Sequence, residues 1–355
     1  MVKWLISILV IIQCLVIGEM ISPDNANILY SGRIDKSNIS DGYYSFSWSG
    51  TQIQLTVVNT TSLQVVLNSS GQNLFNVFIN SVLTLIVNVT STTPSGYGLV
   101  DYALDPQQEY IVLITHRNEP LCGIVQFYGL IADDGVSVSE YQFQQSRKIE
   151  IIGDSITCGY GNLGVNPCPF TPATEDNYLT YGVMTAQALN AEFYIEAWSG
   201  KGVVRNFDYP NITSPDTLPD LYPAIIPNNY PNISLWNFQN YQPDVVIINL
   251  GTNDWSMPPY PDPQNFVDTY IDFIGYLKNQ YSNNPQFFIL CGPMISNPCC
   301  NYVEMVASKT NSVYIPLQNI LNSKNMGCGG HPNYQAHQIM ANMIVPIIQD
   351  TMNWY

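Results

Sequence analysis

One serine in this sequence follows an apolar segment in a way that suits nucleophilic catalysis. The run Lys148–Ile152 leads without a break into Gly153-Asp154-Ser155. A parallel strand that ends here would present Ser155 at the carboxyl edge of its sheet, where open α/β folds place their binding sites. A helical turn after the serine would direct backbone N–H groups to the same point. Gly-Asp-Ser alone also fits an ordinary turn, so a catalytic role for Ser155 needs support from further groups.

A serine hydroxyl becomes a strong nucleophile when an adjacent base accepts its proton, and histidine commonly serves as that base. The chain contains only three histidines. His116 falls in a strand-rich region and His337 lies within a helical pattern, where packing explains it. His331 lies in Gly-His-Pro-Asn, a loop that precedes the last predicted helix. We therefore take His331 as the candidate general base, with a structural loop histidine as the alternative.

Two further segments offer donors for the negative oxygen that forms when an ester is attacked. Asn253 follows the apolar run 245–250, and its side-chain amide can donate a hydrogen bond. Gly200 lies in Trp-Ser-Gly-Lys-Gly after another predicted strand, and its backbone N–H is a second donor. The N–H of Ser155 itself would be a third. Taken singly, each segment also fits a tight turn, because Gly, Asn and Asp favour turns.

The elements that must position these groups alternate along the second part of the chain. From residue 147 apolar runs alternate with amphipathic segments of helical length, which indicates a parallel sheet covered by helices on both faces. Strands are expected over 148–152, 193–198, 245–250, 287–291 and 312–316. Helices are expected over 176–190, 264–281 and 333–353, the last bent or interrupted at Pro346. We assign residues 147–355 to an α/β domain.

The first part of the chain has a different texture. Short runs rich in Val, Ile, Leu, Phe and Tyr are separated by Asn, Ser, Gly and Thr, and several alternate apolar with polar residues. This pattern predicts an antiparallel β-sandwich over residues 25–142. Its strands are expected at 43–48, 52–58, 62–67, 76–79, 82–87, 110–115 and 123–131. The domain boundary is expected near 139–146.

Charge and aromatic content restrict the partners. The formal net charge is −16, which disfavours nucleic acid and anionic lipid surfaces. The chain has 24 tyrosines and 6 tryptophans, which stack well on neutral sugars. Two tryptophans are candidate sugar platforms. One is Trp255, and the other is Trp236, which lies in a long loop over 208–242 that is rich in Pro, Asn and Tyr. Core packing is the alternative for both.

The N-terminus predicts export. Residues 1–18 read as a signal peptide, because Lys3 precedes an apolar run that is short for a membrane span. An uncleaved anchor is the alternative. Acceptor sequences for N-glycosylation support a secreted, extracellular glycoprotein. They begin at Asn38, Asn59, Asn68, Asn88, Asn211 and Asn232.

Removal of the leader takes one of eight cysteines and leaves an odd number. An oxidising compartment favours disulfides. Cys158 and Cys168 flank a short loop and are one candidate pair, and Cys328 with Cys299 or Cys300 is another; at least one cysteine is left as a free thiol or in an intermolecular bond. Zinc is the competing explanation, but the spacings fit no zinc motif and histidines are scarce. Neither a metal nor another cofactor is expected.

Together these blocks resemble the GDSL/SGNH hydrolases, which carry Gly-Asp-Ser, a glycine, Gly-x-Asn-Asp and a C-terminal His-Pro in this order. The resemblance covers 147–355 and is closer still to carbohydrate esterase family 2, whose members join an N-terminal β-sandwich (jelly-roll) domain to an SGNH domain. The matching phrases are 152–161, 198–203, 250–254, 291–294 and 327–333. The resemblance implies a flavodoxin-like α/β fold and a cofactor-free esterase that removes acetyl groups from xylan, glucomannan and related sugars.

One departure from the family pattern concerns the third catalytic group. The family places an Asp two or three residues before the histidine, whereas this chain has Gly329 and Cys328 there. The resemblance then implies a Ser155–His331 dyad in which a backbone carbonyl receives the imidazole N–H. Asp154 is expected to order the turn around the serine.

Two other functions stay open at this point. The lost acid and the sandwich would suit a carbohydrate-binding glycoprotein with a catalytically dead hydrolase domain. A secreted GDSL-type lipid esterase would need an apolar acyl channel, whereas the loops here are polar. The favoured interpretation is a monomeric esterase that acts on acetylated carbohydrate, without nucleic acid and without stable membrane association.

Overall fold

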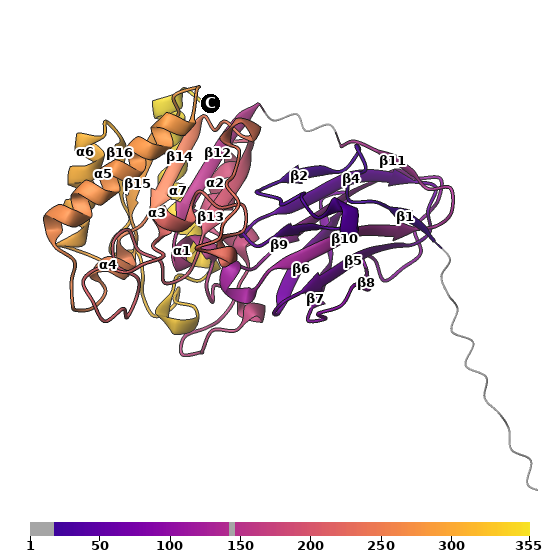
Figure 1. Ribbon diagram of the computed structural model, residues 1–355, viewed down its shortest axis with the longest axis horizontal. Coiled ribbons are helices and arrows are strands. Elements are labelled where there is room, and N and C mark those ends of the chain that lie inside the picture. Colours follow the sequence, from indigo (N-terminus) through magenta and orange to yellow (C-terminus); the bar gives the residue numbers. More distant parts are fainter. Residues whose placement is uncertain (1–17, 142–145) are drawn as a thin grey trace, which may run out of the picture.

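The computed structural model describes residues 18–141 and 146–355, and Figure 1 shows a β-sandwich beside an α/β domain. Apart from Gly18, the predicted signal peptide over 1–18 lies outside the described residues. Across those two ranges, no helix has both the length and the apolar character that a bilayer crossing requires. The last sandwich strand ends at Ser139 and the first strand of the α/β domain begins at Arg147.

The N-terminal domain consists of two antiparallel sheets whose inner faces share one hydrophobic core. The first sheet contains β1 (Glu19–Ile21), β3 (Tyr44–Phe46), β5 (Leu63–Ser69), β8 (Ser95–Gly98) and β10 (Val125–Ala132). The second contains β2 (Leu29–Ser31), β4 (Gln52–Val58), β6 (Asn73–Ile79), β7 (Val82–Val89), β9 (Tyr110–His116) and β11 (Ser137–Ser139). The predicted sandwich is confirmed.

Strand β4 shows how the alternating pattern is used on both faces. Ile53, Leu55 and Val57 are almost fully buried in the sandwich core. The polar residues between them are also buried, because this face borders the α/β domain. Gln52 and Gln54, for example, share a cavity with residues of that domain. The outer face of β4 is therefore covered by the other domain rather than by water.

The α/β domain has a five-stranded, fully parallel sheet with the order β13-β12-β14-β15-β16. Its strands are β12 (Arg147–Gly153), β13 (Ala191–Ala197), β14 (Val245–Asn249), β15 (Gln286–Cys291) and β16 (Val313–Pro316). Numbered along the domain, this order is 2-1-3-4-5, the flavodoxin-like arrangement. The predicted flavodoxin-like parallel sheet is confirmed.

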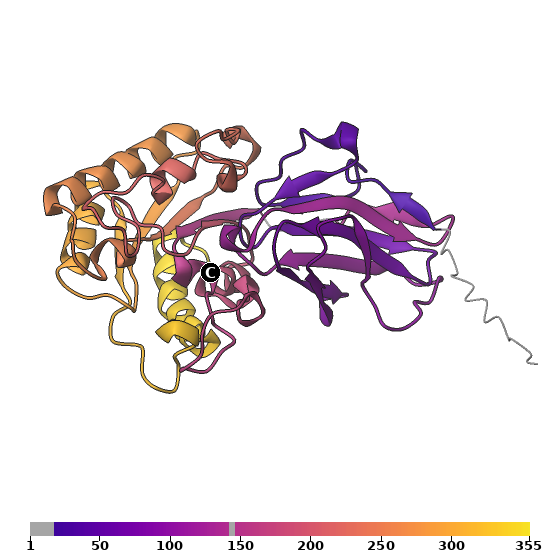
Figure 2. The ribbon, with the colours of Figure 1, turned by 60° about the horizontal axis from the view of Figure 1, so that its bottom comes forward.

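Helices cover both faces of this sheet, and Figure 2 shows α5 above it and α7 below it. On one face pack α5 (Pro263–Gln280) and α6 (Cys299–Lys309), and on the other α2 (Tyr181–Ala188) and α7 (Tyr334–Met352). Strand β14 is buried on both sides. Val246 and Ile248 pack in the core under α5 and α6, and Val245 and Ile247 pack in the core under α2 and α7. This explains why its sequence is an unbroken apolar run.

The helices differ from the sequence predictions in three respects. Of the two alternatives at Pro346, a bend or an interruption, the interruption does not occur: α7 is continuous through the proline, and buried Ile344 and Ile348 hold both sides of it against the sheet. The helix predicted over 176–190 is a turn followed by the shorter α2. Helix α6 was not predicted, since it begins at Pro-Cys-Cys and its polar residues obscure the apolar stripe.

The loop over 208–242 is only partly a surface loop. It contains α3 (Leu218–Leu221), and Leu218, Leu221 and Tyr222 are buried in the α5/α6 core. These anchors hold a polar segment against the domain, which the composition alone did not indicate.

Buried polar contacts fix the two domains together. Arg33 of the sandwich is completely buried and lies 3.0 Å from a carboxylate oxygen of Glu196 and 3.4 Å from one of Glu150. The Trp48 indole N–H donates to the carbonyl of Ala224. Breaking one partner of a buried ion pair costs roughly 3–5 kcal/mol, so this interface favours one fixed arrangement.

Candidate active site

Ser155 and His331 meet at the carboxyl edge of the parallel sheet. Ser155 is the first residue of α1 (Ser155–Cys158), which starts where β12 ends. The His331 Nε2 atom lies 2.8 Å from Ser155 Oγ, although 176 positions separate the two residues. The side chain of Asp154 accepts the N–H of Ile156 and so orders the turn that carries the serine. The distance suits proton transfer from the hydroxyl to the imidazole.

The topology explains why the site forms at this point. The chain leaves β12 toward β13 on one side, while β14 pairs with β12 on the other. This reversal of strand order is the switch point at which open α/β sheets bind ligands. Ser155 follows β12, Gly200 follows β13, and Asn253 lies in α4 (Thr252–Trp255) after β14. Three adjacent strands thus deliver three of the predicted groups.

These groups share one cavity of about 280 Å³. Ser155, Gly200, Asn253 and His331 all line it, together with residues to which the sequence analysis assigned no role. The complete lining is Ser155, Tyr160, Ser199, Gly200, Phe207, Thr252, Asn253, Ser256, Met294 and His331. The sequence analysis assigned no role to Phe207, which lies outside every matching phrase, or to Met294, which ends the phrase 291–294, because only the fold of their loops brings them to Ser155.

The two predicted sugar platforms do not line this cavity. Trp255 is 7% exposed and packs against Phe266 and Tyr302 in the α5/α6 core. Trp236 lies in a separate groove between the domains, beside residues such as Tyr194. The aromatic side chains at the cavity are instead Tyr160 and the half-exposed Phe207.

The loop over 198–201 holds the candidate oxyanion donors in place. Gly200 has φ +80°, a left-handed conformation that glycine adopts without steric cost. The amide of Asn253 donates to the Lys201 carbonyl at 2.8 Å and makes a longer, 3.3 Å contact with Asp154. The amide hydrogen of Asn253 that makes the long contact with Asp154 would bond more strongly to a developing oxyanion.

His331 has no carboxylate partner. No hydrogen bond of good geometry meets its Nδ1 atom among the described residues. Burial lowers the pKa of His331 to about 4, while the nearby backbone carbonyls of Gly329 and Cys328 act in the opposite direction. The Tyr160 ring lies against the imidazole, with 4.4 Å between ring centroids. The imidazole is therefore neutral at pH 7, the state a general base requires.

Two buried aspartates organise the neighbouring loops. Burial raises the pKa of Asp154 to about 7 and that of Asp254 to about 6. Asp254 accepts the backbone N–H groups of Val203, Val204 and Arg205 at 2.7–2.9 Å. It thereby fixes the segment that follows Gly200, a role that the Gly-x-Asn-Asp motif did not reveal.

Both disulfides differ from the expected pairs. Cys168 is bonded to Cys328, three residues before His331, and so ties the 160–170 loop to the histidine loop. Cys158, the predicted partner of Cys168, is instead a buried free thiol. The reason is geometric: Cys158 closes α1 inside the core, and the following turn places Gly161 against the Cys328 backbone. The Cys158–Cys168 prediction is wrong.

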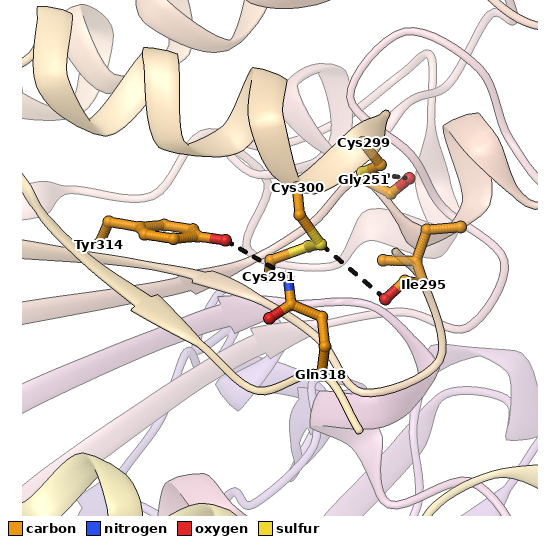
Figure 3. Close-up of a disulfide and its surroundings, with 7 residues drawn as sticks. All are labelled: Gly251, Cys291, Ile295, Cys299, Cys300, Tyr314 and Gln318. Carbon is orange, nitrogen blue, oxygen red and sulfur yellow. Dashed lines mark hydrogen bonds between the residues drawn. A yellow bond between two sulfur atoms is a disulfide. The ribbon is translucent and has the colours of Figure 1, made fainter. Parts of the chain in front are cut away.

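The second disulfide joins Cys291 to Cys300 and holds the loop that carries Met294 (Figure 3). Cys299 is a free thiol 3.5 Å from the Gly251 carbonyl, so neither Cys299 nor Cys300 pairs with Cys328 as predicted. Cys122 is the other unpaired thiol of the described chain besides Cys158 and Cys299. Within the described ranges, no group of three His, Cys, Asp or Glu side chains could hold a metal ion.

Comparison with known proteins identifies both domains. Residues 30–140 match the family Carbohydrate esterase 2 N-terminal, and residues 151–339 match the GDSL-like Lipase/Acylhydrolase family. A solved structure of a family two carbohydrate esterase from Clostridium thermocellum, in complex with cellohexaose, superposes with a TM-score of 0.83. It is 31% identical and covers 92% of this chain and 100% of its own.

Curated relatives point the same way. Cellulase/esterase CelE of Acetivibrio thermocellus is 34% identical over 93% of this chain, which spans 40% of that longer protein. An acetylxylan esterase / glucomannan deacetylase of Cellvibrio japonicus is 27% identical over 86% of this chain and 85% of its own length.

Proposed function

The chain belongs to carbohydrate esterase family 2 within the GDSL-like hydrolases, and on that premise we propose that it removes acetyl groups from polysaccharides or oligosaccharides through a Ser155–His331 dyad. The observation that carries the mechanism is the 2.8 Å contact between Ser155 Oγ and His331 Nε2. The wider cavity supplies the other groups that ester hydrolysis needs.

The proposed reaction proceeds by double displacement. Ser155 Oγ attacks the acetyl carbonyl carbon while its proton passes to His331 Nε2. The N–H groups of Ser155 and Gly200 and the Asn253 amide stabilise the oxyanion. As the C–O bond to the sugar breaks, His331 returns the proton to the departing hydroxyl. A water molecule, deprotonated by His331, then attacks the acetyl-enzyme and releases acetate and the free serine.

The site favours small acyl groups on a sugar over long acyl chains. A cavity of about 280 Å³ is at the lower limit of typical ligand pockets, and Met294 is among its lining residues. Phe207 is 56% exposed at its rim and offers a flat face for a sugar ring. The named activities of the relatives include xylan and glucomannan deacetylation, and a related esterase binds cellohexaose. The intact serine–histidine pair argues against a dead carbohydrate-binding protein.

A substrate panel tests this proposal. We expect acetate release from acetylated xylan, acetylated glucomannan and 4-nitrophenyl acetate, and at least about tenfold lower kcat/KM for 4-nitrophenyl esters of eight or more carbons, because each misfitted methylene in a closed pocket costs free energy. Equal or higher rates with long-chain esters would favour a lipid esterase. Sugar binding without any turnover would favour the dead relative.

The acidic limb of the pH profile is a second prediction. The base must be neutral, and burial lowers the pKa of His331 to about 4, so protonation removes activity only as the pH falls through that value. We expect kcat/KM to fall on the acid side with an apparent pKa near 4, instead of the 6.5 of an ordinary histidine. Initial rates with 4-nitrophenyl acetate from pH 3.5 to 8 measure it. A midpoint at 6.5 would contradict the buried environment described for the base.

We further propose that the protein is a secreted glycoprotein, as the predicted signal peptide suggests, and that it acts as a monomer without stable membrane association. The acceptor asparagines Asn59, Asn88, Asn211 and Asn232 are exposed, and Asn38 is half-buried. Asn68 is 7% exposed and donates to the Tyr128 hydroxyl, so a glycan there would have to break that contact. Glycosidase treatment of protein recovered from the medium of expressing cells tests export and glycosylation together.

A further inference from the structure

A loop of the sandwich domain reaches into the catalytic domain beside the oxyanion donors. It follows β9 and carries Glu119, whose side chain is completely buried. Glu119 Oε2 accepts the backbone N–H of Ser199 at 2.6 Å, and Glu119 Oε1 accepts the Ser199 hydroxyl. One carboxylate of the first domain therefore binds both donors of a residue in the second domain.

Ser199 immediately precedes Gly200, and both line the cavity that holds Ser155. The α/β domain holds this loop through other atoms. Asn253 donates to the Lys201 carbonyl at 2.8 Å, and the Phe207 N–H donates to the Gly200 carbonyl at 2.8 Å. These bonds fix the residues after Ser199, whereas Glu119 fixes Ser199 itself. The orientation of the peptide between Ser199 and Gly200, which contains the Gly200 N–H, thus depends on both domains.

Glu119 is accompanied by a second completely buried acid, Glu175, rather than by a base. Arg117, the nearby cation, pairs with Asp176 at 3.6 Å, and Asn118 donates to Glu175 Oε2 at 3.0 Å. Burial raises the pKa of both glutamates, and that of Glu175 lies well above its usual range. The Ser199 hydroxyl and N–H act in the opposite direction on Glu119, whereas Glu175 Oε1 has no hydrogen-bond partner among the described residues. Glu175 is accordingly the protonated acid of the two, and the donors of Ser199 favour the charged form of Glu119.

This assignment satisfies the buried carboxylate without an ion pair. A carboxylate in an apolar interior is costly unless several donors reach it. Glu119 receives two donors of one residue, the Ser199 N–H and the Ser199 hydroxyl. Hydrogen bonds to an ionised acceptor are roughly twice as strong as neutral ones, so the contact is stiff as well as directional.

We propose that Glu119 is a positioning residue for ester hydrolysis: through Ser199, the sandwich domain sets the direction of the Gly200 N–H toward the oxyanion. This inference rests on the proposed function of the site. It assigns the N-terminal domain a part in the reaction itself, in addition to any part in sugar binding.

The expected consequence appears in kcat. An oxyanion donor acts mainly in the transition state, and complete loss of one costs about 10²–10³ in kcat. Release of Ser199 would misdirect Gly200 without removing its N–H, so a smaller loss is expected. A change that acts only in the transition state lowers kcat and kcat/KM together and leaves KM unchanged.

The experiment compares folded full-length variants with 4-nitrophenyl acetate, which is too small to need a sugar-binding surface. Glu119→Ala should lower kcat about 10- to 50-fold at constant KM, a part of the full loss of a donor. Glu119→Gln keeps the volume and neutral versions of both contacts, so it should lose only about threefold. Ser199→Ala removes the hydroxyl contact from a partly exposed loop position and should also lose about threefold.

Asn76→Ala is the matched control. Asn76 also crosses the domain interface, where it donates to the Asp176 carboxylate at 3.0 Å, but no bond connects it to Ser199. It should lower the melting temperature and leave kcat within twofold of wild type. A comparable kcat loss in Asn76→Ala would mean that general loosening of the interface is responsible and would overturn the proposal.

The remaining outcomes are also decisive. An unchanged kcat in folded Glu119→Ala overturns the inference. If that variant does not fold, unchanged kcat in both Glu119→Gln and Ser199→Ala overturns it. Wild type and Ser155→Ala are measured alongside. If Ser155→Ala stays active, the proposed function fails; if it is inactive while the variants at 119 and 199 match wild type, only this inference fails.

Discussion

Replacement of Ser155 by alanine is expected to lower kcat for acetate release by roughly 10⁴-fold or more, as loss of the nucleophile does in serine hydrolases with an intact oxyanion site. The physical reason is that the variant lacks Ser155 Oγ, which lies 2.8 Å from His331 and would form the acetyl-enzyme. Release of acetate from acetylated xylan and hydrolysis of 4-nitrophenyl acetate provide two independent measurements.

The control for this prediction is the fold and the ligand site of the same variant. Ser155 is 6% exposed and alanine is smaller, so the melting temperature should change little. Binding of a deacetylated oligosaccharide should persist, since the walls of the cavity are unchanged. Activity within tenfold of wild type in the alanine variant would exclude Ser155 as the nucleophile.

Replacement of His331 by alanine is expected to lower kcat at pH 7 by roughly 10³-fold or more, because no other base contacts Ser155 in the part of the chain that the structure describes. The described site contains no carboxylate that could act as the base in place of His331, since Cys328 and Gly329 occupy the positions where the family pattern has an aspartate. The residual rate should rise with pH, as hydroxide replaces the missing base.

A double variant separates a catalytic dyad from two independent contributions. Residues that act as one unit are strongly non-additive, so Ser155→Ala combined with His331→Ala should be about as slow as Ser155→Ala alone. Additive losses would show that His331 contributes through some other route, such as the shape of the cavity. The measurement is kcat for all three variants at pH 7 and pH 9.

Most of the fold could be predicted because the apolar periodicity of each strand or helix can be read from its own short segment of sequence. The unbroken apolar run that forms β14 and the alternation in β4 follow directly from whether one or both strand faces are buried. The order of the parallel strands came from resemblance to the family, since periodicity gives no strand order. The helix is not interrupted at Pro346, because tertiary packing on both sides of the proline outweighs one lost hydrogen bond.

The site was predictable only where a motif follows or precedes a regular element. Ser155, Gly200, Asn253 and His331 satisfy that condition, and the structure brings all four to one cavity. The disulfide partners were not predictable, because pairing depends on the distance between Cα atoms, 4.6 Å for Cys168 and Cys328, across a separation of 160 residues.

Glu119 illustrates a second limit of sequence analysis. It lies in the sandwich, outside every motif of the hydrolase domain, and only the docking of the two domains brings it to Ser199. Trp255 illustrates the reverse, because it lies two residues after Asn253 yet turns into the α5/α6 core. Proximity in sequence to a catalytic motif therefore predicts function less well than proximity to the cavity.

The central claim is that the Ser155 hydroxyl is a nucleophile activated by His331. Covalent labelling with phenylmethylsulfonyl fluoride, followed by peptide mass spectrometry, tests it most directly. We predict stoichiometric labelling of Ser155 in parallel with loss of activity, and no labelling in the same time when His331 is replaced by alanine. Labelling of a different residue in step with inactivation, or unchanged labelling of Ser155 without His331, would contradict the account.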